Sequence, residues 1–175
     1  MKSMNVFPQL KTKRLVMNAY KPTDAEVVFF LRSSPEVTKY IKRDPYTSIE
    51  QAEDFIKMIS HQFENDLSIT WALRFEEEGD LLGSICFWNF SEDRKTAEIG
   101  YDLQPIHQGK GYMTEALNAI IKYGREELKL NLIEAFTSTY NEASIKLLTN
   151  NDFVLNESRV DDDNLDNLIF EMKIP

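Results

Sequence analysis

The residues best suited to bind a ligand lie where a strand-like segment meets a helix-like segment, in Leu103-Gln-Pro-Ile-His-Gln-Gly-Lys-Gly-Tyr-Met113. The two glycines allow backbone N–H groups to turn toward one point and let a ligand approach closely. The N-terminus of a helix adds unpaired N–H donors and a partial positive charge. This loop is therefore suited to hold a phosphate or pyrophosphate group. An ordinary turn between a strand and a helix would use the same glycines, so the loop alone leaves both interpretations open.

The loop carries Gln108-x-x-Gly111-x-Met113, and neither Gly-Lys-Ser/Thr nor an early G-x-G-x-x-G occurs in the chain. It resembles the coenzyme A signature of the GNAT superfamily of N-acyltransferases, Gln/Arg-x-x-Gly-x-Gly/Ala. The resemblance is strongest to the RimJ/RimL-like branch, which acetylates the N-termini of ribosomal proteins. Met113 departs from the pattern, because it stands where the family has a small residue.

Hydrophobic periodicity and capping signals predict the order of the elements. Capping boxes at Thr23-Asp-Ala-Glu26 and Ser48-Ile-Glu-Gln51 predict one helix over about 24–32 and a second that ends near residue 65. Apolar segments at 68–75, 81–89 and 96–103 predict three antiparallel strands. The other expected elements are a strand at 15–20, a helix from Tyr112, a strand at 132–139, a helix at 142–150 and strands at 153–160 and 168–174.

This order of elements is also that of the GNAT fold, so the resemblance covers nearly the whole chain. It implies an α/β (α+β) fold with a mixed central sheet of about seven strands, splayed at the cofactor site, and about four flanking helices. The 175 residues fit one domain, 1–175. The net charge of −9 argues against direct binding to nucleic acid, which needs a basic surface. We find neither a signal peptide nor a membrane-spanning apolar segment, and expect a cytoplasmic protein without a membrane partner.

The resemblance also implies where acetyl-CoA binds. In the family, the strands that here end near Leu103 and Thr139 splay apart and admit the pantetheine arm between them. An Asn after the second strand, here Asn141, contacts the coenzyme, and it is also a good N-cap for the next helix. The residues expected to bind coenzyme A are Leu103, Gln108, Gly109, Lys110, Gly111, Tyr112, Met113 and Asn141.

The leaving thiolate needs a hydrogen-bond donor. Many family members carry a Tyr seven residues after the Asn, but Leu148 stands there in this chain. The RimL-like branch has a Ser three residues after the Asn, and Ser144 matches it. Its hydroxyl would stabilise the thiolate by hydrogen bonding more than by full proton transfer. Tyr140 is an alternative donor, although we expect its ring to pack.

The acceptor amine must lose a proton before it attacks a thioester. Glu98 is the preferred base, and Asp102 lies on the same face of the same predicted strand. The acidic hairpin Asp161, Asp162 and Asp163 is a second candidate site, because RimL-like proteins tend to carry a carboxylate there. Each of these groups could instead be a solvated surface acid.

Metal and covalent chemistry find less support in the sequence. His61 and His107 have no partner at metal-ligand spacing, so no metal is expected. Cys86 lies in an apolar segment and is expected to be a small core residue rather than a nucleophile.

The sequence thus predicts acetyl transfer from acetyl-CoA to a primary amine by direct attack. A protein or peptide N-terminus is the preferred acceptor. A small amine, such as a polyamine, an amino sugar or an amino-acid derivative, remains an alternative, as does a non-catalytic coenzyme A-binding module. A homodimer is compatible with each of these functions.

Overall fold

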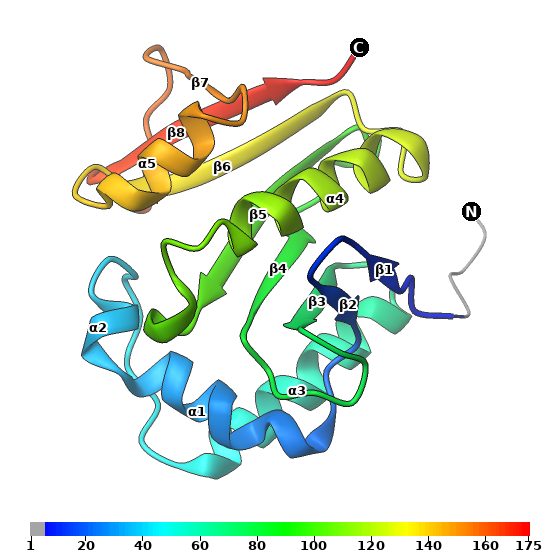
Figure 1. Ribbon diagram of the computed structural model, residues 1–175. Helices are drawn as coiled ribbons and strands as arrows, with labels where there is room; N and C mark the ends of the chain where they lie inside the picture. Colours follow the sequence, from blue (N-terminus) through cyan, green and yellow to red (C-terminus); the bar gives the residue numbers. More distant parts are fainter. Residues whose placement is uncertain (1–5) are drawn as a thin grey trace.

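The computed structural model describes residues 6–175, which form one mixed sheet with helices on both faces (Figure 1). The strands are β1 (Leu10–Lys11), β2 (Val16–Asn18), β3 (Ile69–Arg74), β4 (Gly83–Trp88), β5 (Thr96–Leu103), β6 (Leu132–Ser138), β7 (Val154–Leu155) and β8 (Asn167–Lys173). Their order in the sheet is β1-β2-β3-β4-β5-β6-β8-β7. All neighbours are antiparallel except β5 and β6, which are parallel. The predicted mixed sheet is confirmed, with two very short strands at its edges.

The helices occupy the expected places in the chain. They are η1 (Pro22–Asp24), α1 (Ala25–Ser33), α2 (Pro35–Thr38), α3 (Ile49–Glu64), η2 (Pro105–His107), α4 (Tyr112–Glu126) and α5 (Glu142–Thr149). The capping box at Ser48 is confirmed, because Gln51 Oε1 accepts a hydrogen bond from the Ser48 N–H at 3.2 Å. The box at Thr23 is wrong. The carboxylate of Asp24 accepts from the Lys21 N–H at 2.7 Å instead, so a 3₁₀ turn precedes α1.

Two hydrophobic clusters lie on the two faces of the sheet. On one face, α4 packs its Leu117 and Ile120 against core residues of β4 and β5 such as Phe87 and Ile99. On the other face, α1 and α3 pack around Ala72 of β3. Figure 1 shows α4 and α5 together in front of the strands, with α1 and α3 below them. We call these the α4 face and the α1 face.

The strand expected over 153–160 is wrong beyond residue 155. Asn156 ends β7, because its Oδ1 accepts from the N–H of Ser158 at 3.1 Å and from its hydroxyl at 2.7 Å. Such a side chain replaces ladder hydrogen bonds with a local turn. The segment 156–166 is therefore a long loop beside the end of β6.

The sheet opens between β5 and β6. The two strands pair over four residues each, from Thr96 with Leu132 to Ile99 with Ala135. Beyond this point β5 remains paired with β4 as far as Leu103, and β6 remains paired with β8 as far as Ser138. The predicted splay thus begins at Gly100, inside β5 rather than at its end.

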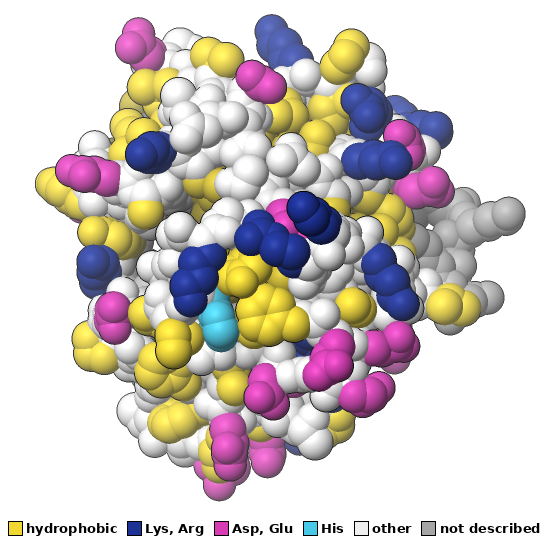
Figure 2. Space-filling model, in the orientation of Figure 1, with side chains coloured by type: hydrophobic (Ala, Val, Ile, Leu, Met, Phe, Trp, Pro, Cys, Tyr) yellow, Lys and Arg dark blue, Asp and Glu magenta, His cyan; other side chains and the backbone are white. Residues whose placement is uncertain are grey.

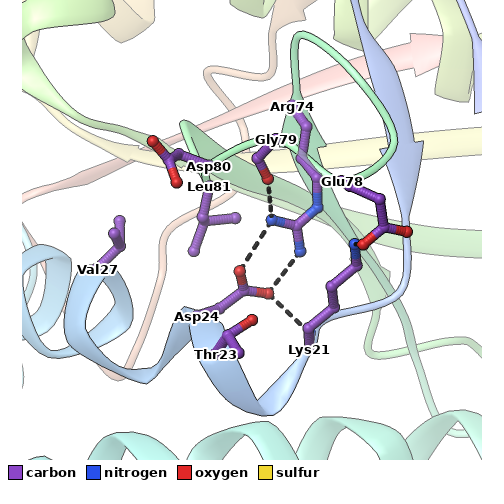
Figure 3. Close-up of a pocket in the computed structure, with 9 residues that line it drawn as sticks. All are labelled: Lys21, Thr23, Asp24, Val27, Arg74, Glu78, Gly79, Asp80 and Leu81. Carbon is purple, nitrogen blue, oxygen red and sulfur yellow. Dashed lines mark hydrogen bonds and ion pairs between the residues drawn. The ribbon is translucent and has the colours of Figure 1, made fainter.

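A buried ion pair holds η1 to the α1 face. Arg74 of β3 is 1% exposed and Asp24 4%. The guanidinium donates from Nη1 to Asp24 Oδ1 at 2.8 Å and to the Gly79 carbonyl at 3.0 Å, and from Nε to Asn18 at 2.9 Å. Figure 3 shows this arrangement beside a small pocket, with Lys21 and Glu78 at its edge. Because its donors are used within the protein, this pair serves the fold.

No helix within residues 6–175 is long and apolar enough to cross a membrane.

Candidate active site

The glycine loop has the backbone geometry that the sequence predicts. Gly109 has φ +70° and Gly111 φ +80°, both in the left-handed region. Gly111 is the N-cap of α4 and has no side chain to accept the first N–H groups of the helix. The first turn of α4 therefore presents N–H donors at an exposed loop, which suits an anion.

Side chains of the loop hold its shape from within. Gln108 donates from Nε2 to the Leu103 carbonyl at 2.9 Å, and Lys110 donates from Nζ to the Ile106 carbonyl at 2.7 Å. Tyr112 and Met113 pack against the hydrophobic cluster of the α4 face. The bulk of Met113 is thus directed into the core. The structure brings together seven of the eight residues expected to bind coenzyme A, all but Asn141.

Arg14 contacts the glycine loop from a distant part of the chain, and no sequence pattern predicts this contact. It lies between β1 and β2 and donates from Nη1 to the Lys110 carbonyl at 2.9 Å. Its Nε pairs with Glu115 of α4 at 2.7 Å, and its guanidinium lies 4.5 Å from the centre of the Tyr112 ring. Figure 2 shows Lys and Arg side chains gathered around the start of α4. No local pattern marks Arg14, because its partners lie about a hundred residues later.

Ser144 and Tyr101 meet across the opened strands. The Tyr101 hydroxyl lies 2.6 Å from Ser144 Oγ, and Ser144 is buried. Burial raises the pKa of Tyr101 to about 12, while the hydrogen bond with Ser144 lowers it. Asn141 caps α5 as predicted, since its Oδ1 accepts from the Ser144 N–H at 3.1 Å. Tyr140 is 65% exposed, so the expectation that its ring packs is wrong.

Glu98 is a buried carboxyl on β5, only 9% exposed. Burial is the main cause that raises its pKa, to about 7. A hydrogen bond from Asn89 at 3.3 Å opposes this shift, and the charges of Glu134 and Asp161 reinforce it. Glu98 is therefore half ionised near neutral pH, as a general base requires.

The acidic hairpin lies in the same electrostatic environment as Glu98. Asp161 accepts hydrogen bonds from the Asp163 N–H at 3.0 Å and from Asn167 at 2.8 Å, whereas the side chains of Asp162 and Asp163 are exposed. Arg159 forms ion pairs with Glu134 and with Glu171, the latter at 2.8 Å. The charge of Asp161 reaches Glu98 and helps to raise its pKa, so the two predicted carboxylate sites are neighbours.

The carboxylate of Asp102 is hydrogen-bonded to Ser84 of β4. Its Oδ1 accepts from the N–H of Ser84 at 2.9 Å and from its hydroxyl at 2.7 Å. Asp102 lies four residues beyond Glu98 on the same face of β5, or roughly 13 Å at the rise of a strand. This bonding makes Asp102 the weaker candidate for the base.

Neither the thiol nor the histidines form a reactive group. Burial raises the pKa of Cys86 to about 12, so the thiol stays protonated. His107 packs its ring against Phe75 and Tyr112, at 5.6 and 6.5 Å between ring centres. Within the part of the chain that the structure describes, no three His, Cys, Asp or Glu side chains are grouped to hold a metal ion.

The raised pKa of Glu98 predicts a pH-dependent stability. The folded state holds the proton up to about pH 7, whereas the unfolded chain releases it near 4.5. The stabilising contribution is therefore complete below pH 4.5 and is lost as pH rises through 7. Between pH 4 and 8, the difference in free energy of unfolding, Glu98→Gln minus wild type, should rise by about 2 kcal/mol after allowance for solvent screening. Urea unfolding at several pH values measures this difference, and a flat profile would contradict the raised pKa.

Comparisons with known proteins agree with this geometry. Residues 14–154 match the model of the acetyltransferase (GNAT) domain family. An uncharacterized N-acetyltransferase p20 of Bacillus licheniformis is 39% identical over 149 residues, 82% of this chain and 81% of that protein. The ribosomal-protein-serine acetyltransferase of Escherichia coli is 34% identical over 79 residues, 45% of this chain and 44% of that protein.

A solved structure shows the same fold. RimL, a ribosomal L7/L12 alpha-N-protein acetyltransferase in complex with coenzyme A, superposes with a TM-score of 0.80 at 18% identity, over 95% of this chain and 98% of that one. At this identity the likeness concerns the fold. The match of the family model and the 39% identity to the N-acetyltransferase p20 show that the chain belongs to the GNAT family and is an acetyl-CoA-dependent N-acetyltransferase.

Proposed function

We propose that this enzyme transfers the acetyl group of acetyl-CoA directly to the N-terminal amine of a protein or peptide. The observation that carries this proposal is the opening of the sheet after Ile99 and Ala135. The glycine loop follows one of the two separated strands, and Ser144 follows the other. Glu98 pairs with Glu134, directly before the last pair between the two strands.

The chain offers matching groups for each part of acetyl-CoA. The first turn of α4, with Gly109 and Gly111, suits the pyrophosphate. The edge of β5 from residue 100 to 103 faces away from β4 and can pair with the amides of the pantetheine arm. Asn141 lies at the start of α5, on the opposite side of the opening. Lys110 and Arg14 add positive charge at the loop.

Glu98 serves as the base on the α1 face. It takes a proton from the ammonium group, directly or through water, and the amine nitrogen then attacks the thioester carbon. A carbon–nitrogen bond forms and the carbon–sulfur bond breaks, so negative charge moves to sulfur. The extra proton of the acylated nitrogen then passes to the thiolate, and coenzyme A leaves as the thiol. A pKa near 7 allows Glu98 to accept the first proton and release it to solvent afterwards.

Ser144 and Tyr101 serve the leaving group from the α4 face. Tyr101 lies on the side of β5 opposite to Gly100, and Ser144 belongs to α5, which covers the α4 face. If Tyr101 donates to Ser144 Oγ, the serine hydroxyl is free to donate to the thiolate. Acceptor and leaving group are thus served from opposite sides of the sheet.

Two features support a slender acceptor such as a peptide N-terminus. Lys42 donates from Nζ to the Asp163 carbonyl at 3.3 Å, which joins the segment between α2 and α3 to the loop between β7 and β8. A bulky folded surface would have to separate them. The similarity to two ribosomal-protein acetyltransferases favours a peptide, whereas the same bond also suits a small amine, the second candidate.

Binding and thiol release test this function together. Acetyl-CoA should raise the melting temperature, because a ligand at 100 times its Kd stabilises the folded state by about 2.7 kcal/mol. ATP and NAD serve as controls. Free coenzyme A is then assayed with N-terminal peptides and small amines. A shift with ATP or NAD alone, or thiol release that does not depend on any amine, would refute the proposal.

Glu98→Gln should lower kcat/KM at neutral pH by roughly a hundredfold and much less at pH 9. The amide cannot accept a proton, whereas alkaline buffer supplies neutral amine without a base. Asp161→Asn is the matched control, because it removes a neighbouring charge at the same site. If Asp161→Asn shows the larger, pH-dependent loss, the hairpin carboxylate is the base.

Ser144→Ala should lower kcat roughly tenfold to a hundredfold and leave acetyl-CoA affinity nearly unchanged. The hydrogen bond strengthens as charge develops on sulfur, so its loss, on the order of 1–3 kcal/mol, falls on the transition state. Tyr101→Phe should lower kcat less, because it only orients the serine. Tyr140→Phe is the control. A greater loss in Tyr140→Phe than in Ser144→Ala would make that tyrosine the donor.

A further inference from the structure

The side chain of Arg43 has a buried hydrogen-bond donor without an acceptor. Its Nε is the one buried side-chain nitrogen or oxygen within residues 6–175 that has no hydrogen-bond partner. A buried polar group of this kind destabilises the protein unless something pairs with it. Burial and the nearby charge of Arg32 both lower the pKa of Arg43.

Arg32 supplies a second guanidinium close to Arg43, and its guanidinium packs against two aromatic rings. Its Cζ lies 3.5 Å from the centre of the Phe55 ring and 5.4 Å from that of Tyr46. The Tyr46 N–H donates to the Arg32 carbonyl at 3.0 Å, so the segment that carries Arg43 is tied to the end of α1. Neither arginine lies within 4.0 Å of a carboxylate oxygen in the described part of the chain.

Arg32 lies on the α1 face, the side of the sheet where Glu98 lies, because its guanidinium stacks on Phe55, which packs against the cluster of that face. The charges of Arg32, Asp102 and Glu98 all affect the Cys86 thiol, and Asp102 also affects Arg43. Cys86 is in register with Gly100, where the sheet opens. The glycine loop precedes α4, which packs on the opposite face. The anion that these arginines suit is therefore distinct from the coenzyme phosphates.

Asp102 does not neutralise the pair. One of its carboxylate oxygens already accepts two hydrogen bonds from Ser84. Two guanidinium groups thus have one carboxylate in their neighbourhood, and neither forms an ion pair with it. This arrangement leaves a local positive charge and a free donor, and a guanidinium is well suited to pair with a carboxylate.

We propose that Arg32 and Arg43 bind a carboxylate of the acceptor, close to the amine that is acetylated. This inference rests on the proposed function and names the class of its substrate. From Gly100 to Asp102 the strand advances roughly 7 Å, which one or two residues of an extended acceptor would span. The ammonium lies toward Glu98 and the carboxylate toward the arginines, so the acceptor carries both charges. It is an acidic peptide N-terminus or a free amino acid.

Matched acceptors separate the two sources of the carboxylate. Two pairs of amidated peptides test for recognition of a side-chain carboxylate. One pair begins with Asp-Ser or Asn-Ser, and the other begins with Ser-Asp or Ser-Asn. Serine and serinamide test an α-carboxylate. For wild type we expect the acidic member of at least one pair to have a kcat/KM roughly tenfold to a hundredfold higher, and Arg43→Gln and Arg32→Gln should each bring the ratio close to one. Lys39→Gln is the control, because Lys39 is an exposed cation just after α2.

A ratio close to one for all three pairs in wild type, or a preference that survives in both arginine variants, would overturn the inference. A separate measurement does not require turnover. With coenzyme A present, N-acetylaspartate should raise the melting temperature of wild type but not of Arg43→Gln, and N-acetylasparagine should raise neither. If no amine is acetylated, the proposed function fails, and this binding measurement still decides whether the arginines hold a carboxylate.

Discussion

The short parallel contact between β5 and β6 is the constraint on which the site depends. Each of these strands has a long antiparallel partner, β4 for β5 and β8 for β6. The sheet is therefore two antiparallel halves, joined by four residue pairs. Because strands twist, each half follows its own partner once the shared ladder ends. The freed edges carry backbone groups that need partners, and an extended ligand arm can supply them.

The hydrogen bond between Tyr101 and Ser144 spans this opening. It connects β5 of one half with α5, which follows the strand of the other half. The Asn141 cap positions Ser144, and the pairing of β5 with β4 positions Tyr101. The distance between the two hydroxyls therefore depends on how far apart the two halves of the sheet lie.

Local patterns predicted those parts of the site that depend on neighbouring residues. The predicted bounds of β5 agree with the structure, because its apolar and polar residues alternate. The glycine loop and the Asn141 cap depend only on adjacent residues. Tyr101, Arg14 and Arg159 were missed because their partners lie far away in the chain. The capping box at Thr23 failed for a similar reason. Asp24 is fixed by the buried Arg74, fifty residues later, and its carboxylate takes the place of the expected cap.

The net charge of the chain is −9, but acidic and basic groups are unevenly distributed along the α1 face. At the Glu98 end, Arg159 forms ion pairs with Glu134 and Glu171. Burial is the main cause of the high pKa of Glu98, and the charge of Glu134 adds to it. At the Asp102 end, two arginines face one partly engaged carboxylate. The proposed base and the arginines proposed to bind a carboxylate thus lie on either side of the point where the strands separate. In the proposed reaction the attack on the thioester takes place at that point, and the order of charges along β5 then favours an acceptor that carries both an amine and a carboxylate.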